Sequence, residues 1–216
     1  DHLGDAAAAA LVREARTTGA LDHPNIVPAY ALGLTSEGPM LVMKRVQGVP
    51  WSTLIHDPAH PALEGHVGDP LGRHLEILMQ VSNAVEFAHR RGVIHRDLKP
   101  ENVMVGDLGE VVLLDWGLAI RLQEARDESP AGTPAYMAPE SLTGGVSART
   151  DVYLLGGLLH EVITGLPPHP GNSLHEVLLS VLEGQPYRYD ANVPPELAAL
   201  CARAMEHEPD ARFESA

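Results

Sequence analysis

The chain has 216 residues, of which 44% are hydrophobic and 20% are charged, so a single domain of this length can bury a substantial core. The 15 Lys and Arg residues against 29 Asp and Glu residues give a formal net charge of -14, which argues against binding to a nucleic-acid phosphate backbone. A single cysteine excludes a disulfide framework and fits a reducing, cytoplasmic compartment, and no apolar run reaches the roughly 18 residues of a membrane segment.

The first third of the chain is predicted to hold one helix and two strands. A run of good helix formers predicts a helix over residues 6–20. Residues 26–33 and 39–46 are rich in Val, Ile, Leu and Met, which indicates two strands joined by a turn. Residues 56–70 are dense in His, Pro and Gly and are predicted to form a loop insertion.

The remainder of the chain is predicted to be mainly helical. Apolar residues at helical spacing predict a helix over residues 71–91. Short apolar runs at residues 103–105 and 111–114 predict a small hairpin, and residues 118–139, which show no period, are expected to form a long ordered loop. Three more helices are predicted, over residues 151–164, 173–183 and 195–206.

The densest chemical signal is the run His95-Arg96-Asp97-Leu98-Lys99-Pro100-Glu101-Asn102. Phosphoryl transfer needs a carboxylate that orients the attacking hydroxyl and accepts its proton, a cation that neutralises the transferred group, and oxygen ligands for Mg²⁺. Asp97, Lys99 and Asn102 supply these groups on one tight loop, and Asp115 could supply a second metal ligand. The alternative without chemistry is a charged turn beside a hairpin.

Three motifs in order along the chain resemble those of eukaryotic-type (Hanks-type) protein kinases. The run from His95 to Asn102 resembles their catalytic loop. Asp115-Trp116-Gly117 resembles their metal-binding triplet, usually Asp-Phe-Gly, and Ala138-Pro139-Glu140 resembles the motif that closes their activation segment. The Lys-Pro-Glu-Asn ending and the run Gly132-Thr133-Pro134-Ala135-Tyr136 resemble the Ser/Thr branch, and the Trp variant resembles its bacterial members.

The resemblance implies an α+β, protein-kinase-like fold of two lobes. Residues 1–48 would be an incomplete small lobe of one helix, two strands and the hinge, and residues 49–216 a mostly helical large lobe. The implied reaction transfers the γ-phosphoryl group of ATP, with Mg²⁺, to Ser or Thr hydroxyls of a protein substrate. Its catalytic residues would be Asp97, Lys99, Asn102, Asp115 and Thr133, of which Asn102 and Asp115 would ligate the metal.

Further positions match the family's nucleotide site and its structural supports. Glu14 falls where the family has the Glu that pairs with an ATP-holding Lys. Met43 would be the gatekeeper, and the backbone of Lys44 and Val46 would meet adenine. The family's structural residues correspond to His95, packed on the metal-binding triplet, Asp151, which braces the catalytic loop, and Arg212, which pairs with Glu140.

One departure concerns the nucleotide site. Only 13 residues precede Glu14, and they contain neither a Gly-rich phosphate loop nor any Lys. We expect a fragment that starts at Asp1, just after the Lys strand, and stops within the final helix, with weak activity or none in the chain as given. The alternative function is a pseudokinase that acts as a nucleotide-sensing or scaffold module, and membrane anchoring by other parts of the parent protein stays open.

Other chemically distinctive residues receive structural interpretations. The spacing of the four histidines within and after the 56–70 segment is not typical of zinc, so they are predicted to lie in an exposed loop: His56, His60, His66 and His74. Cys201 is predicted to be a buried thiol on an apolar helix face. Ser129 is the one candidate phosphosite of the activation segment besides Thr133, and its acidic neighbours predict weak or absent activation by phosphorylation.

Overall fold

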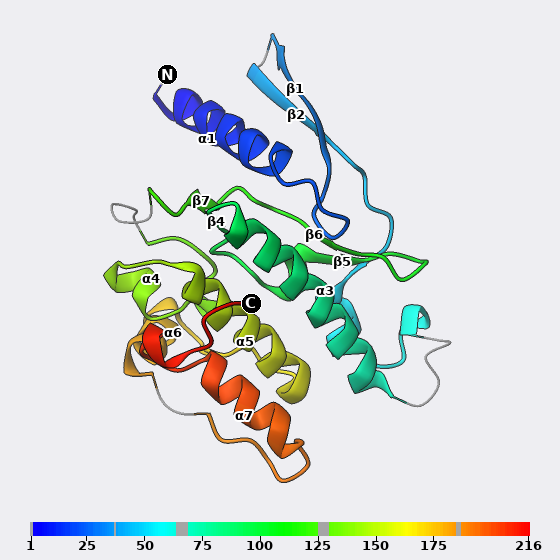
Figure 1. Cartoon of the computed structure of the whole chain (residues 1–216), viewed down its shortest axis with the longest axis vertical. Helices are drawn as coiled ribbons and strands as arrows, with labels where there is room; N and C mark the ends of the chain where they lie inside the picture. The colour runs from blue at the N-terminus through cyan, green and yellow to red at the C-terminus, as the bar shows by residue number, and fades with distance from the viewer. Residues whose placement is uncertain (1, 37, 64–68, 125–129, 185–186) are drawn as a thin grey trace.

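The computed structural model describes residues 2–216 except residues 37, 64–68, 125–129 and 185–186. At one end of the molecule, α1 (His2–Gly19) lies beside the antiparallel hairpin of β1 (Ala29–Thr35) and β2 (Gly38–Met43) (Figure 1). In this hairpin Thr35 pairs with Gly38, and the register is irregular between Ala29 and Ala31.

Two further small sheets lie near the polar run at residues 95–102. The first is antiparallel with strand order β3-β5-β6, and the second pairs β4 with β7. Their bounds are Val49–Pro50 (β3), Val93–Ile94 (β4), Val103–Val105 (β5), Val111–Leu113 (β6) and Ile120–Arg121 (β7).

Helices make up most of the rest of the chain. Figure 1 shows α3 running past the small sheets and α5 and α7 lying beyond it, and α5 contacts both α3 and α7. The α-helices are α2 (Trp51–His56), α3 (Pro70–Arg90), α4 (Glu140–Thr143), α5 (Ala148–Thr164), α6 (Leu174–Glu183) and α7 (Pro195–Ala204). Single turns of 3₁₀ helix lie at Pro61–Leu63 (η1), Pro100–Asn102 (η2), Pro134–Tyr136 (η3) and Pro209–Ala211 (η4).

The two long central helices begin at residues that satisfy their free N–H groups. Asp69 caps α3, since its Oδ1 accepts from the Gly72 N–H at 2.9 Å, and Pro70 occupies the first turn, where no N–H is needed. Ser147 and Thr150 form a capping box at the start of α5. This cap is why α5 begins at Ala148 rather than at the predicted residue 151.

The core lies between the helices and the β3-β5-β6 sheet. Fully buried side chains from α2, α3, the polar run and α5 meet there: Trp51, Ile77, Leu98 and Leu158. The β1–β2 end is linked to this core through Leu113, whose carbonyl accepts from the Val27 N–H at 3.1 Å and whose N–H donates to the Asn25 carbonyl at 2.8 Å.

The structure confirms most of the predicted elements and corrects some bounds. The helix predicted over residues 6–20 spans His2–Gly19, so it begins before the predicted start. The first strand begins at Ala29, because Pro28 has no N–H to donate. The predicted loop at 56–70 includes the last residue of α2 and η1, and residues 118–139 contain β7 and η3. Among the described residues, no helix has both the length and the apolar character needed to cross a membrane.

Candidate active site

The backbone of the polar run is held in shape by the carboxylate of Asp151, on the first turn of α5. Arg96 adopts a left-handed conformation, with φ of 69°, which a residue with a Cβ rarely takes. Asp151 Oδ2 accepts from the His95 N–H at 2.8 Å, and Oδ1 accepts from the Arg96 N–H at 2.9 Å. The side chain of Asp151 is completely buried, so these bonds pin the two peptide groups from inside the fold.

The same carboxylate meets His89, in the last turn of α3. The distance from His89 Nε2 to Asp151 Oδ2 is 2.7 Å. Burial by itself would raise the pKa of Asp151, but the hydrogen bond and charge of His89, with the donors around His95, outweigh it and lower that pKa. Asp151 is therefore ionised at neutral pH and acts as a fixed negative anchor.

Asp97, Lys99 and Thr133 form one closed cluster. The Thr133 hydroxyl donates to Asp97 Oδ1 at 2.7 Å, and Lys99 Nζ donates to Thr133 Oγ1 at 2.7 Å. Lys99 Nζ also lies 3.0 Å from Asp97 Oδ2. The carboxylate of Asp97 and the ammonium of Lys99, both on one loop, are thus hydrogen-bonded to the hydroxyl of Thr133, which is 34 residues or more away in the chain.

This cluster keeps the Asp97 carboxylate ionised. Asp97 is 6% exposed, and its burial would raise its pKa. The hydrogen bonds from Thr133 and Lys99 and the positive charge of Lys99 more than offset burial, so the pKa of Asp97 lies below its ordinary value. At neutral pH Asp97 is a carboxylate, which can orient a hydroxyl group and accept its proton.

Asn102 and Asp115 present oxygen atoms of the kind that Mg²⁺ prefers. The Asn102 amide nitrogen donates to the Asp97 carbonyl at 2.9 Å, which leaves its Oδ1 for another partner. The Leu114 N–H donates to the Asn102 carbonyl at 2.7 Å, so the residue before Asp115 is bonded to the loop. Asp115 is exposed, with φ of 54°, and its Oδ1 accepts from the Gly117 N–H at 3.2 Å. Asn102 Oδ1 and the Asp115 carboxylate therefore fit a magnesium ion as oxygen ligands.

Glu14 of α1 faces the Asp115-Trp116-Gly117 triplet. A Cβ added to Gly117 would lie 3.5 Å from Glu14 Oε2, an ordinary van der Waals contact, so the carboxylate lies beside this glycine. Burial raises the pKa of Glu14, and the negative charge of Asp115 raises it further. The two carboxylates are therefore close enough to repel each other.

The residues expected to meet adenine lie apart from the Asp97 cluster. Met43 ends β2, is 38% exposed and lines a hollow of about 560 Å³ together with Glu14. The Lys44 N–H donates to the Pro28 carbonyl at 2.9 Å, and Val46 packs against the core. Within the described ranges, no hydrogen bond or ion pair joins these three residues to the loop at 95–102.

The two structural partners expected from the sequence are both in place. His95 packs edge-on against Trp116, with ring centroids 4.6 Å apart. Arg212 forms a bidentate pair with Glu140 at 2.6 and 2.9 Å, and its side chain is completely buried. Thr150 also donates to Glu140, at 2.8 Å.

A partly buried network near Thr133, formed by Tyr136, Glu161 and the exposed His56, was not predicted. The Tyr136 hydroxyl donates to Glu161 Oε2 at 2.5 Å, and His56 Nε2 lies 3.0 Å from Glu161 Oε1. Burial raises the pKa of Glu161, while the bonds from Tyr136 and His56 lower it in part. Tyr136 and His56 are 25 and 105 residues from Glu161 in the chain, so no local sequence pattern predicts these contacts.

The remaining sequence interpretations have mixed outcomes. The prediction of an exposed loop is wrong for His74, which is buried in α3 and accepts from Trp51 Nε1 at 2.9 Å. The described part of the chain holds no group of three or more His, Cys, Asp or Glu residues that could bind a metal. Cys201 is completely buried, and burial raises the pKa of its thiol to about 11. Ser129 and His66 lie outside the described residues.

Comparison with known proteins agrees with this geometry. A family model described as "Protein kinase domain" matches residues 2–215. The chain is 36% identical to the serine/threonine-protein kinase PknB of Mycolicibacterium smegmatis, over 94% of this chain and 33% of that protein. It is 33% identical to PknD of Chlamydia muridarum, over 94% of this chain and 25% of that protein. For PrkC of Bacillus subtilis the identity is 31%, over 94% of this chain and 31% of that protein. The chain thus spans a third or less of the length of these relatives.

Proposed function

This chain belongs to the protein kinase family, in its bacterial Ser/Thr branch, and we propose that it transfers the γ-phosphoryl group of ATP to Ser or Thr hydroxyls of a protein substrate. The observation that carries the proposal is the cluster in which Thr133 bonds both Asp97 and Lys99. Such a cluster places a proton acceptor and a cation within 3.0 Å of each other.

In the proposed reaction, the substrate hydroxyl oxygen bonds to the γ-phosphorus as the bond from that phosphorus to the β–γ bridging oxygen breaks, and ADP leaves. Asp97 orients the hydroxyl and takes its proton. The ammonium group of Lys99 neutralises charge on the transferred phosphoryl group, where a preorganised cation is worth more than in water. Thr133 holds the two groups in position.

The metal and nucleotide roles follow from the free acceptor groups. Asn102 Oδ1 and the Asp115 carboxylate would hold Mg²⁺, which shields the phosphate charge when bound. We place adenine against Met43 and the backbone of Lys44 and Val46. Because the Lys44 N–H already donates to the Pro28 carbonyl, the carbonyl of Lys44 is the backbone group left to contact adenine. Glu14 would hold a cation near the phosphates.

Three variants test these assignments. Asp97→Asn keeps the size of the side chain but removes the base, so we expect transfer from γ-labelled ATP to Ser/Thr peptides to fall at least about 100-fold, with nucleotide binding retained. Asp115→Ala is expected to remove Mg²⁺-dependent ATP binding. Asp107→Asn, an exposed carboxylate in the turn between β5 and β6, is the matched control and should change neither quantity.

The outcomes separate the proposal from its alternative. Full activity of Asp97→Asn would refute the role of the base. Because the chain as given is expected to have weak activity or none, transfer is measured on the full-length protein, and nucleotide binding by that protein without any transfer would instead support the pseudokinase, a nucleotide-sensing or scaffold module.

A further inference from the structure

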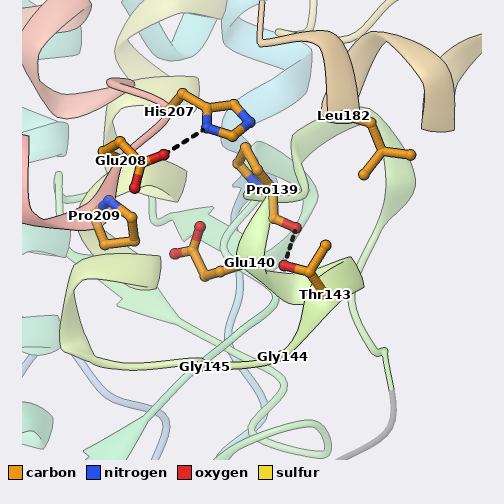
Figure 2. A pocket seen from close by; sticks show the side chains of 9 residues that line it. All are labelled: Pro139, Glu140, Thr143, Gly144, Gly145, Leu182, His207, Glu208 and Pro209. Carbon is orange, nitrogen blue, oxygen red and sulfur yellow. Dashed lines mark hydrogen bonds and ion pairs between the residues drawn. The ribbon is translucent and has the colours of Figure 1, made fainter.

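A second pocket, of about 410 Å³, lies where the residues after the Thr133 segment meet α6 and the loop before η4. It shares no lining residue with the Asp97 cluster or with the hollow beside Met43. Figure 2 shows its side chains arranged around an open centre, with Leu182 from α6 on one side and Glu208 and Pro209 on the other.

The walls of this pocket are partly apolar, and the pocket is already formed in the chain without a partner. Leu182 is 47% exposed, and prolines 139 and 209 add rigid apolar surface. Gly144 and Gly145 have no side chain. The space beside each is open, because an added Cβ would meet nothing within 4 Å. A half-exposed leucine beside rigid prolines favours an apolar partner side chain.

The loop of the pocket is fixed against the end of α6. Gly184 ends that helix, and a Cβ added there would lie 2.3 Å from His207 Cδ2. His207 in turn lies 3.5 Å from Glu208. The end of α6 therefore packs directly against this loop.

The charge at the pocket is negative. Glu140, on its inner side, is neutralised by Arg212, whose side chain is completely buried and cannot reach a ligand. The Glu208 side chain is 81% exposed. Glu206, two residues earlier in the chain, is also exposed, whereas the carboxylate of Asp210 is paired with Arg149. Neither Lys nor Arg is among the described residues that line the pocket.

We propose that this pocket docks a basic segment of the protein substrate, with a leucine-sized side chain against Leu182 and a Lys or Arg beside Glu208. This proposal rests on the proposed kinase function. The pocket begins at Pro139, three residues after the segment Thr133–Tyr136, so a substrate bound here stays close to the residues that lead to the Asp97 cluster. The same helix carries two further exposed leucines, Leu174 and Leu179.

The probe is a fluorescein-labelled peptide of eight alternating Leu and Arg residues, and its partner carries Glu in place of every Arg. Fluorescence anisotropy should show binding of the basic peptide alone. Leu182→Asp and Glu208→Lys should each weaken it by about tenfold. Leu200→Asp alters a leucine of equal exposure, 47%, on α7, and Asp190→Lys alters an exposed carboxylate, so these controls should change binding less than about twofold.

Several results would overturn the docking proposal. These are equal binding of the acidic peptide, equal losses in the control variants, or self-association of the protein that Leu182→Asp abolishes, which would assign the pocket to a second copy. Phosphotransfer to a short acceptor peptide is measured in parallel with the full-length protein. Its persistence without specific basic-peptide binding overturns the docking proposal alone, and its absence with such binding overturns the kinase proposal alone.

Discussion

Two buried histidines should make the helical part of this protein sensitive to acid. His160 of α5 is 8% exposed, and His169, in the segment before α6, is 1% exposed. Burial lowers the pKa of each to about 4, and the charge of His160 adds to the effect on His169. At pH values below the ordinary histidine pKa of 6.5, these side chains bind protons more readily in the unfolded chain than in the folded one.

Their hydrogen bonds agree with a neutral state. His169 Nε2 lies 2.9 Å from the Tyr153 hydroxyl and its Nδ1 lies 3.1 Å from the Ser180 hydroxyl, so a neutral ring can accept from one and donate to the other. His160 Nδ1 lies 3.0 Å from the Tyr189 hydroxyl. No carboxylate is among these partners, and burial outweighs the backbone hydrogen bond with Met137 that favours the charged ring of His169.

The size and sign of the effect follow from proton linkage. A folded pKa below the unfolded value contributes stability that is present above the unfolded pKa of 6.5 and is lost as pH falls toward the folded value of about 4. Between pH 7.5 and pH 5, each histidine should lower the free energy of unfolding by about 2 kcal/mol. Together they remove about 4 kcal/mol, a large part of a typical stability of about 5–15 kcal/mol.

Urea unfolding at pH 7.5 and pH 5 measures this difference. Trp51 and Trp116 are both buried, so their fluorescence reports loss of the core. In His160→Gln and in His169→Gln, the change in unfolding free energy between the two pH values should shrink by about 2 kcal/mol, whatever the stability at pH 7.5. His175→Gln removes an exposed histidine of α6 and is the control.

Comparing variants cancels the other titrating groups. The raised pKa values of Glu14 and Glu161 act in the opposite direction, because these folded carboxyls gain protons more readily as pH falls. They are present in every variant. An unchanged pH dependence in both buried-histidine variants, or an equal change in His175→Gln, would show that the reasoning is wrong.

Three further predictions concern ion pairing, positioning and capping. Arg212→Met should lower the free energy of unfolding by about 3–5 kcal/mol, since it leaves the Glu140 carboxylate buried without its cation, and the double variant with Glu140→Gln should recover part of this in urea unfolding. Thr133→Val should lower kcat about 10- to 100-fold with little change in the KM for ATP, and Thr133→Ser should restore it; equal effects of both substitutions would contradict a hydroxyl role. Ser147→Ala should destabilise the protein by about 0.5–2 kcal/mol through loss of the α5 cap, and an unchanged thermal midpoint would contradict this.

Elements with a strong period or a dense motif were predictable from the sequence. The helix expected at 71–91 is Pro70–Arg90, and the hairpin expected at 103–105 and 111–114 is β5 and β6. The loop residues Asp97, Lys99 and Asn102 were found together because the motif is contiguous. Thr133 was placed beside them by resemblance rather than by spacing.

Long-range pairs were the part that sequence patterns could not supply. The β4–β7 pair has two residues in each strand, too few to show a period, and it joins segments that are 26 residues apart or more. His89 meets Asp151 across 62 residues, and His56 meets Glu161 across 105. Such partners are set by packing of α3, α2 and α5, not by any local preference.

Acid should therefore act on the site through α5 rather than through Asp97 or Asp151. Asp97 and Asp151 have pKa values lowered from 3.8, so both stay ionised where His160 and His169 already reduce stability. Helix α5 carries both Asp151 and His160. Loss of packing around His160 would release the carboxylate that holds the left-handed backbone at Arg96, so activity should fall in step with unfolding between pH 6.5 and pH 4. A loss of activity well above the unfolding transition would point instead to titration within the site.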